Sequence, residues 1–200
     1  QGEVGAWNFA RLLESISPLM EEPKSLHEAL DSYYESYRRH SSRMWAEKLG
    51  LDRFQEGDGD LVSELTSVMQ LTETDMTILF RTLSTIQGPD SNHLTRAFYK
   101  EEEIPQNEWN SWLDRWWDRV DGRPDRESML NANPKYVLRN WMAQLAIDAA
   151  EKEDYSVATA LYEMLKKPYD EQPGNEEKWF SRRPEWARNR VGCSMLSCSS

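Results

Sequence analysis

The sequence predicts an all-α fold, organised as an irregular bundle of about six to eight helices. The first observation is that apolar residues recur at helical spacing over most of the 200 residues. The second is that no stretch bounded by turn residues alternates strictly between apolar and polar side chains, as a half-buried strand would. The third is a supply of large side chains, with nine tryptophans, eight tyrosines and five phenylalanines, which suffices for one well-filled core.

The first two expected helices lie near the N-terminus. The first ends near Pro18, and its apolar stripe consists of Trp7, Ala10, Leu13 and Ile16. The second begins near Ser25. Ser25 and Glu28 have the spacing of a capping box, in which the hydroxyl and the carboxylate bond free backbone N–H groups. This helix ends at Gly50, and its stripe consists of Leu26, Ala29, Leu30, Tyr33 and Tyr37.

Two further expected helices follow a loop at residues 55–60. Asp60 is positioned to cap the first of them, whose stripe consists of Leu61, Leu65, Val68 and Met69. Thr72 and Asp75 have the spacing of another capping box, and the helix after them ends at Gly88. The stripe of this helix consists of Met76, Leu79, Phe80, Leu83 and Ile86.

The most regular pattern begins at Pro105 and ends at Gly122, with one face formed by Trp109, Trp112, Leu113, Trp116, Trp117 and Val120. We interpret this face as a packing seam rather than a cofactor site. Asn133 and Pro134 are expected to start a helix that carries Val137, Leu138, Trp141, Met142, Leu145, Ile147 and Ala149. The last clear helix runs from Ser156 to just before Pro168, and the residues after it are expected to be irregular.

These last two helices resemble one unit of a helical repeat, but no period of about 30 to 45 residues recurs elsewhere. We therefore expect a helical region at residues 1–177 and a basic, cysteine-containing tail at residues 178–200. The tail carries a net charge of +4, whereas residues 1–177 carry −15. A basic tail of this kind is expected to lie on the acidic body or on a partner.

The overall charge limits the kinds of partner. A net charge of −11 and an isoelectric point near 4.8 argue against general attraction to nucleic acid or to an anionic membrane. The sequence has no apolar run long enough to cross a bilayer and no secretory signal pattern. These features favour an intracellular protein that is not embedded in a membrane.

A search for catalytic, cofactor-binding or metal-binding motifs assigns no residue to any of these roles. No glycine-rich phosphate loop and none of the protein-kinase motifs H-R-D, D-F-G or V-A-I-K is present. Residues 57–60 lack the terminal glutamate of a calcium loop. His27 and Asp31 share a helix face but lack the second histidine of a zinc motif, and His40 and His93 lie in polar surroundings.

The two cysteines, Cys193 and Cys198, are the candidates for reactive side chains. Both lie in the last eight residues, so they cannot organise the fold as a disulfide framework. A solvated thiol near arginines is partly deprotonated, and it can then be oxidised or exchanged. The alternative, that both are idle thiols on a frayed end, remains open from composition.

With these residues in view, the chain resembles the C-terminal part of the selenoprotein O family from its first residues to its last. The most specific stretch is residues 133–144, N-P-K-Y-V-L-R-N-W-M-A-Q, which is similar to the family signature N-P-x-x-V-L-R-N-x-x-A-Q. Supporting stretches are residues 7–12, 48–51, 75–77 and 80–81. The ending at Cys198 is similar to the family's terminus, where the matching position is selenocysteine or cysteine.

The resemblance implies a parent protein with a protein-kinase-like fold. That parent would bind ATP with Mg²⁺ or a similar ion and transfer AMP to serine, threonine or tyrosine hydroxyls of proteins. The nucleotide-binding and metal-binding residues would precede Gln1, so none is assigned to these positions, and neither ATP nor Mg²⁺ is expected to bind this chain alone. The resemblance supports Cys198 as a redox-responsive residue, with Cys193 as its neighbour. Location would be cytoplasmic in bacteria and mitochondrial in eukaryotes.

Two hypotheses follow. A family member should be more than twice as long, and the chain begins with Gln1 rather than methionine, so we expect a fragment, a split gene product or a decayed copy. In that case the chain supports a catalytic lobe and is inactive alone. The alternative is a non-catalytic helical interaction module, in which the tryptophan seam or the basic tail binds a partner protein.

Overall fold

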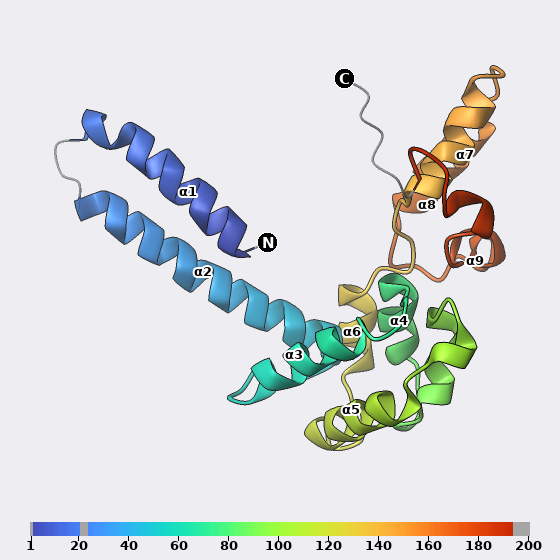
Figure 1. Ribbon diagram of the computed structural model, residues 1–200, viewed down its shortest axis with the longest axis horizontal. Helices are drawn as coiled ribbons and strands as arrows, with labels where there is room; N and C mark the ends of the chain where they lie inside the picture. The colour runs from blue at the N-terminus through green and yellow to red at the C-terminus, as the bar shows by residue number, and fades with distance from the viewer. Residues whose placement is uncertain (1, 21–23, 194–200) are drawn as a thin grey trace. The chain divides into compact units, whose positions relative to one another are not determined.

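The computed structural model describes residues 2–20 and 24–193 (Figure 1). Within these ranges every regular element is a helix, and an isolated antiparallel bridge joins Thr74 and Phe98. The predicted all-α class is therefore confirmed. Among these residues no helix is long and apolar enough to cross a membrane. The chain divides into two units, Gln1–Ala46 and Glu47–Ser200, and each is described by itself.

The first unit is a helical hairpin. It consists of α1 (Gly2–Ile16), the short 3₁₀ helix η1 (Ser17–Leu19) and the main part of α2 (Lys24–Leu49). The two helices touch through small and aromatic residues: the Tyr33 hydroxyl donates to the backbone oxygen of Gly2 at 3.1 Å. A Cβ atom on Gly2 would lie 2.2 Å from the ring of Tyr37, so only glycine allows this close approach.

The bounds of both hairpin helices agree with prediction, but two details differ. Because α2 begins at Lys24, Ser25 lies inside its first turn rather than before it as an N-cap. Ala6 and Leu13 are the buried residues of α1, whereas Trp7, assigned to the buried stripe, is 62% exposed. A step of three residues is shorter than the 3.6 residues of one helical turn. A stripe built from i+3 steps therefore winds around the helix and leaves the buried face.

The second unit contains shorter helices. They are α3 (Asp58–Val68), α4 (Met76–Leu83), η2 (Ser91–Ala97), η3 (Glu101–Glu103), α5 (Gln106–Arg119), α6 (Arg126–Ala132), α7 (Asn140–Ala150), α8 (Ser156–Leu165), α9 (Pro173–Trp179) and η4 (Glu185–Ala187). α3 packs against α5, α4 against η2, and α7 against α8.

The tryptophan face of α5 forms the core of this unit. Trp109, Trp112, Leu113 and Trp116 are buried, and the rings of Trp112 and Trp116 stack with their centroids 6.0 Å apart. The indole N–H of Trp112 donates to the backbone oxygen of Leu61, and that of Trp116 donates to the backbone oxygen of Leu49, both at 2.9 Å. The buried rings therefore confirm that this face is a packing seam.

The helix starts near residues 58 and 76 differ from the prediction. α3 begins at Asp58, so Asp60 lies within its first turn instead of capping it. The Asp58 carboxylate accepts hydrogen bonds from the Arg119 guanidinium at 2.8 and 3.1 Å, which holds this turn against α5. Asp75 is itself the N-cap of α4 and accepts from the backbone N–H of Ile78 at 3.1 Å. A capping role for Thr72 is therefore wrong.

The segment after Asn133 is the main error in the predicted helices. Residues 134–139 are not helical, and α7 begins only at Asn140. Asn133 follows α6 as its C-cap instead of opening a helix. Tertiary hydrogen bonds, described below, hold residues 133–139 in a non-helical path. After Pro168, where the sequence indicated only irregular structure, Pro173 opens α9.

Candidate functional site

Four charged side chains meet beside residues 133–139, and we call them the ionic cluster: Arg81 of α4, Lys135, Glu171 and Glu176 of α9. The residues Arg81 and Lys135 are only 4% and 3% exposed. Fully buried cations are rare in proteins unless they are paired. The cluster is therefore the part of the second unit where polar chemistry is most constrained.

Arg81 joins three segments of the chain. One terminal nitrogen donates to the backbone oxygens of Leu130 and Asn133 at 2.9 and 3.0 Å. The other donates to the backbone oxygen of Tyr169 at 3.0 Å and to the Glu171 carboxylate. The rigid fork of a guanidinium suits this arrangement, because it presents several donors in one plane. Arg81 thereby satisfies carbonyl oxygens at the end of α6, where helical hydrogen bonds stop.

Lys135 is the second cation of the cluster. Its ammonium donates to the carboxylates of Glu171 at 2.7 Å and Glu176 at 2.9 Å. Burial by itself lowers the pKa of Lys135, but the hydrogen bonds with the two carboxylates outweigh it, so the pKa is raised. The same contacts lower the pKa of Glu171 and of Glu176, with the bond to Lys135 as the largest cause in each.

Backbone contacts fix the path of the chain next to Lys135. The backbone N–H groups of Lys135 and Tyr136 both donate to the backbone oxygen of Pro168, at 2.9 and 3.0 Å. The buried Tyr136 hydroxyl donates towards the backbone oxygens of Glu171 and Gln172, at 2.8 and 3.1 Å. These contacts replace helical hydrogen bonds, which explains why the strong helix signals at residues 133–139 are overridden.

Two further polar pairs flank the cluster. Arg139 forms a bidentate ion pair with Asp75 at the start of α4. Asn133 donates to the backbone oxygen of Lys48 at 3.0 Å and accepts from its ammonium at 2.8 Å. That ammonium also lies 4.4 Å from the centre of the Phe80 ring, and burial lowers the pKa of Lys48. The 133–139 segment is thus tied to both ends of α4 and to the end of α2.

A small pocket of about 150 Å³ lies beside these pairs. Its lining includes Lys48, Phe80 and Pro134, with Met76 and Val137 at its edge. Met76 and Val137 are 60% and 39% exposed. The lining is mainly apolar, and it contains no carboxylate that could hold a metal ion.

The site's chemistry is that of internal charge pairing. The terminal nitrogens of Arg81 and the ammonium of Lys135 donate to carboxylates and carbonyl oxygens of the protein itself. The buried Nε of Arg81 has no acceptor among the described residues. Among residues 2–20 and 24–193, no group of three or more histidine, cysteine, aspartate or glutamate side chains could hold a metal ion. The arrangement stabilises the fold.

Only one of the two redox candidates, Cys193, lies among the described residues. Cys198 lies outside the described residues. Cys193 is 7% exposed and has a free thiol, and its backbone oxygen accepts from the Asn140 side chain at 3.2 Å. Nearby, Arg190 forms an ion pair with Asp148 of α7. The end of the described chain is thus attached to the start and the last turn of α7.

The other sequence candidates lie in different parts of the chain. His27 and Asp31 lie in the first unit and belong to no group of three or more potential metal ligands among the described residues. His40 contacts Ser36 on its own helix through Nδ1. Within residues 57–60, the buried Asp58 carboxylate is paired with Arg119. His93 is an exposed residue of η2.

The basic tail lies on the acidic body of the chain in the part that is described. Arg183 and Arg188 both pair with Glu73, and Arg190 pairs with Asp148. Arg182 donates to the backbone oxygen of Phe98. The positive charge near the C-terminus is therefore used inside the chain.

Sequence reasoning missed Arg81, Lys135 and Arg139 as the centre of this site. The signal was nevertheless present, because these residues belong to two of the stretches that carried the family resemblance, 80–81 and 133–144. Arg139 binds Asp75 in a third such stretch, and Arg81 binds the backbone of Asn133. Stretches that are far apart in sequence thus contact one another here.

The fold and this site define the class: an all-helical protein region whose described part has buried, internally paired charges. The family model for "Protein adenylyltransferase SelO" matches residues 1–166, so the chain belongs to that family. The resemblance found in the sequence is confirmed.

Relatives of this chain bear the name "Protein nucleotidyltransferase YdiU". The protein of Flavobacterium johnsoniae is 46% identical over 213 residues, and the match covers 100% of this chain and 41% of the relative. Those of Aromatoleum aromaticum and Rhodopirellula baltica are each 41% identical, with 100% of this chain and 40% and 41% of the relative covered. The chain thus spans about two fifths of the length of these relatives.

Proposed function

We propose that the chain is the helical C-terminal region of a protein adenylyltransferase. In that protein a kinase-like lobe, outside these 200 residues, binds ATP with Mg²⁺ or a similar ion. The hydroxyl oxygen of a serine, threonine or tyrosine bonds to the α-phosphorus of ATP, AMP is transferred, and pyrophosphate leaves. The chain supports the lobe and transfers no AMP by itself.

The observation that carries this proposal is the ionic cluster in a chain of the SelO family. Its buried cations already have protein acceptors, and the described residues offer no glycine-rich loop or carboxylate group for a nucleotide and its metal. The proposal therefore places ATP and the metal on the lobe. The cluster's role is to fix the 133–139 segment so that the region presents one defined surface.

The redox part of the proposal concerns Cys198. We propose that it responds to oxidation, with Cys193 as its neighbour in sequence and the lobe as a second source of partners. A thiol that can be oxidised reversibly needs thiolate character and access to solvent. Arginines at positions 182–190 supply positive charge near the tail, although several are paired with carboxylates.

A non-catalytic interaction module is less well supported. Both features that would bind a partner are largely occupied within the chain: three of the four indole groups of the seam are buried, and tail arginines pair with Glu73 and Asp148.

Incubation with labelled ATP, Mg²⁺ and a mixture of proteins tests the proposal. We expect no transfer of label by the 200-residue chain. We expect transfer by the chain joined to the remaining portion of the Flavobacterium johnsoniae relative. Label transfer by the chain alone would overturn the supporting role, and no transfer by the joined protein would overturn the proposed activity.

A further inference from the structure

α1 exposes large apolar side chains that the hairpin does not cover. Val4, Trp7 and Leu12 are 63%, 62% and 55% exposed, whereas Ala6 and Leu13 are buried in the hairpin. Exposed polar side chains, among them Arg11, lie between these apolar residues. The hairpin therefore leaves a mixed apolar and polar surface of α1 uncovered.

This exposure is part of a wider pattern in the first unit. Its exposed large apolar side chains are Val4, Trp7, Leu12, Leu19, Met20, Tyr34, Tyr37 and Met44. The unit makes up less than a quarter of the sequence. A concentration of exposed apolar residues of this kind marks an interaction surface more often than a free one.

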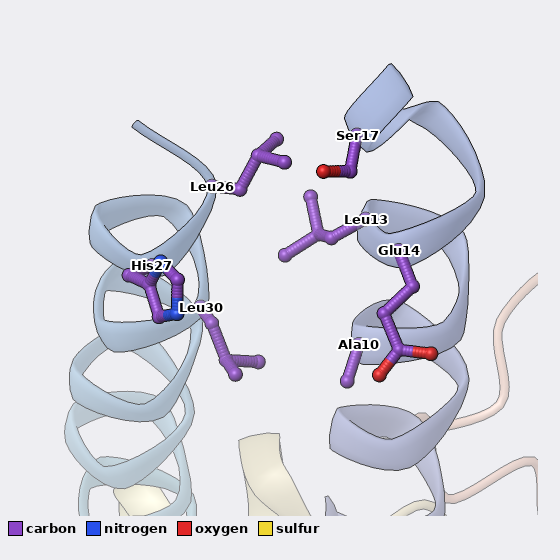
Figure 2. A pocket seen from close by; sticks show the side chains of 7 residues that line it. All are labelled: Ala10, Leu13, Glu14, Ser17, Leu26, His27 and Leu30. Carbon is purple, nitrogen blue, oxygen red and sulfur yellow. The ribbon is translucent and has the colours of Figure 1, made fainter. Parts of the chain in front are cut away.

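A pocket adds shape to this surface. It has a volume of about 180 Å³ and lies between α1 and α2 near their connection (Figure 2). Figure 2 shows Leu26 and Leu30 of α2 pointing toward Leu13 of α1, with Glu14 and His27 at the edge. A water molecule occupies about 30 Å³ of liquid, so the pocket has room for a large apolar side chain.

The exposed Trp7 lies on the same side of α1 as the pocket. Trp7 and the pocket residue Glu14 are seven residues apart, which is two helical turns. Arg11 lies between them in sequence and pairs with Glu14. We call Val4, Trp7, Leu12 and the pocket the hairpin surface. Apolar groups surrounded by charged side chains are typical of protein–protein contacts.

We propose that the hairpin surface docks the kinase-like lobe of the same polypeptide, which rests on the function proposed above. The relatives have about three fifths of their length outside the match, so there is enough protein to cover this surface. In that function the lobe is joined directly to α1, and a covalent link gives it a high effective concentration there. An anionic membrane is disfavoured as the occupant because the chain carries −11.

The test uses two versions of the protein: the 200-residue chain, and the same chain joined to the remaining portion of the Flavobacterium johnsoniae relative. Each receives the pair Trp7→Glu and Leu12→Glu. The matched control is the pair Tyr155→Glu and Tyr162→Glu in the second unit, where both side chains are similarly exposed at 63% and 65%. Thermal unfolding midpoints and sedimentation are measured for all variants.

We expect Trp7→Glu with Leu12→Glu to lower the unfolding midpoint of the joined protein by about 5 °C or more, because charged groups then face an apolar contact. The midpoint of the chain alone should stay unchanged, and the control pair should change neither protein. An unchanged unfolding midpoint of the joined protein overturns the proposal. An equal fall in the midpoint of the chain alone also overturns it, since the surface would then already be covered within the 200 residues. A chain that sediments as a dimer and is dissociated by the same pair points to a second copy as the occupant and also overturns it.

Failure of the docking proposal is distinguishable from failure of the proposed function. Transfer of label from ATP is measured on the unsubstituted joined protein. If no AMP is transferred but Trp7→Glu with Leu12→Glu still lowers its midpoint, the docking stands and the activity does not. If AMP is transferred and the midpoint is unaffected, the activity stands and the docking does not.

Discussion

Arg139 and Asp75, 64 residues apart in sequence, form a bidentate ion pair in which the same carboxylate also caps α4. The Asp75 side chain is 4% exposed and that of Arg139 is 16% exposed. Arg139 is the N-cap residue of α7, so the pair joins the starts of two helices. Removing one partner would leave the other buried and unpaired.

Substitution of Asp75 should therefore cost more than the loss of a helix cap. For Asp75→Ala we expect the free energy of unfolding to fall by about 3–5 kcal/mol, the range for breaking a buried ion pair. The matched control is Asp90→Ala, because Asp90 caps η2 through an exposed contact with the backbone of Asn92. That variant should lose about 1 kcal/mol or less. Urea unfolding measures both, and equal losses would show that the pair with Arg139 contributes nothing beyond capping.

Arg81 should be the most sensitive cation of the second unit. Arg81→Met removes donors from the backbone oxygens of Leu130, Asn133 and Tyr169 and leaves Glu171 with one fewer partner. We expect a loss of about 3–5 kcal/mol in the free energy of unfolding. Arg123→Met is the control, since Arg123 and its partner Asp121 are 82% and 85% exposed, and it should change stability by about 0.5 kcal/mol or less. Similar effects of the two substitutions would contradict the structural role of Arg81.

The ionic cluster also predicts how stability depends on pH. The pKa of Glu171 and of Glu176 is lowered in the folded chain, so their contribution is present above the ordinary value of 4.5 and is lost as the pH falls through the lowered values. The pKa of Lys135 is raised, so its contribution is complete below 10.5 and is lost as the pH rises through the raised value.

Urea unfolding at a series of pH values between about 2 and 7 tests the acidic side. We expect stability to fall below about pH 4.5, and we expect the double variant Glu171→Gln and Glu176→Gln to be less stable at pH 7 with a shallower acidic decline. Glu177→Gln is a suitable control, because Glu177 is an exposed neighbour of Glu176 in sequence. An acidic decline of the same steepness in the double variant would remove the cluster as its cause.

The sequence predicted the parts of the fold that depend on local signals. Pro105 and Gly122 delimit α5 because proline and glycine act on the backbone next to them, and the tryptophan face follows from helical periodicity. The family was also recognisable from short stretches. Trp7 was misplaced because a stripe built from i+3 steps winds away from the buried face of the helix.

The candidate site was less predictable because it depends on contacts between distant residues. Asn133 and Pro134 have every local feature of a helix start, but Lys48 and Arg81 bind Asn133 from 85 and 52 residues away. The backbone oxygen of Pro168 accepts hydrogen bonds from the backbone N–H groups of Lys135 and Tyr136. No spacing rule within one helix contains that information. Buried polar pairing overrides helix propensity here, and only the tertiary structure reveals it.

The two cysteines should differ in their reactions. Cys193 is 7% exposed, so in the variant Cys198→Ser we expect alkylation of the Cys193 thiol to be at least about tenfold slower in the folded chain than in urea.

In the protein joined to the lobe, we expect AMP transfer to differ between oxidising and reducing conditions, and we expect Cys198→Ser to abolish this difference. Cys193→Ser separates the two thiols: if Cys198 reacts with a cysteine of the lobe, the redox response persists in this variant, and if it reacts with Cys193, the response is lost. Equal activity of the Cys198→Ser variant and the unsubstituted protein under both conditions would remove the redox role of Cys198.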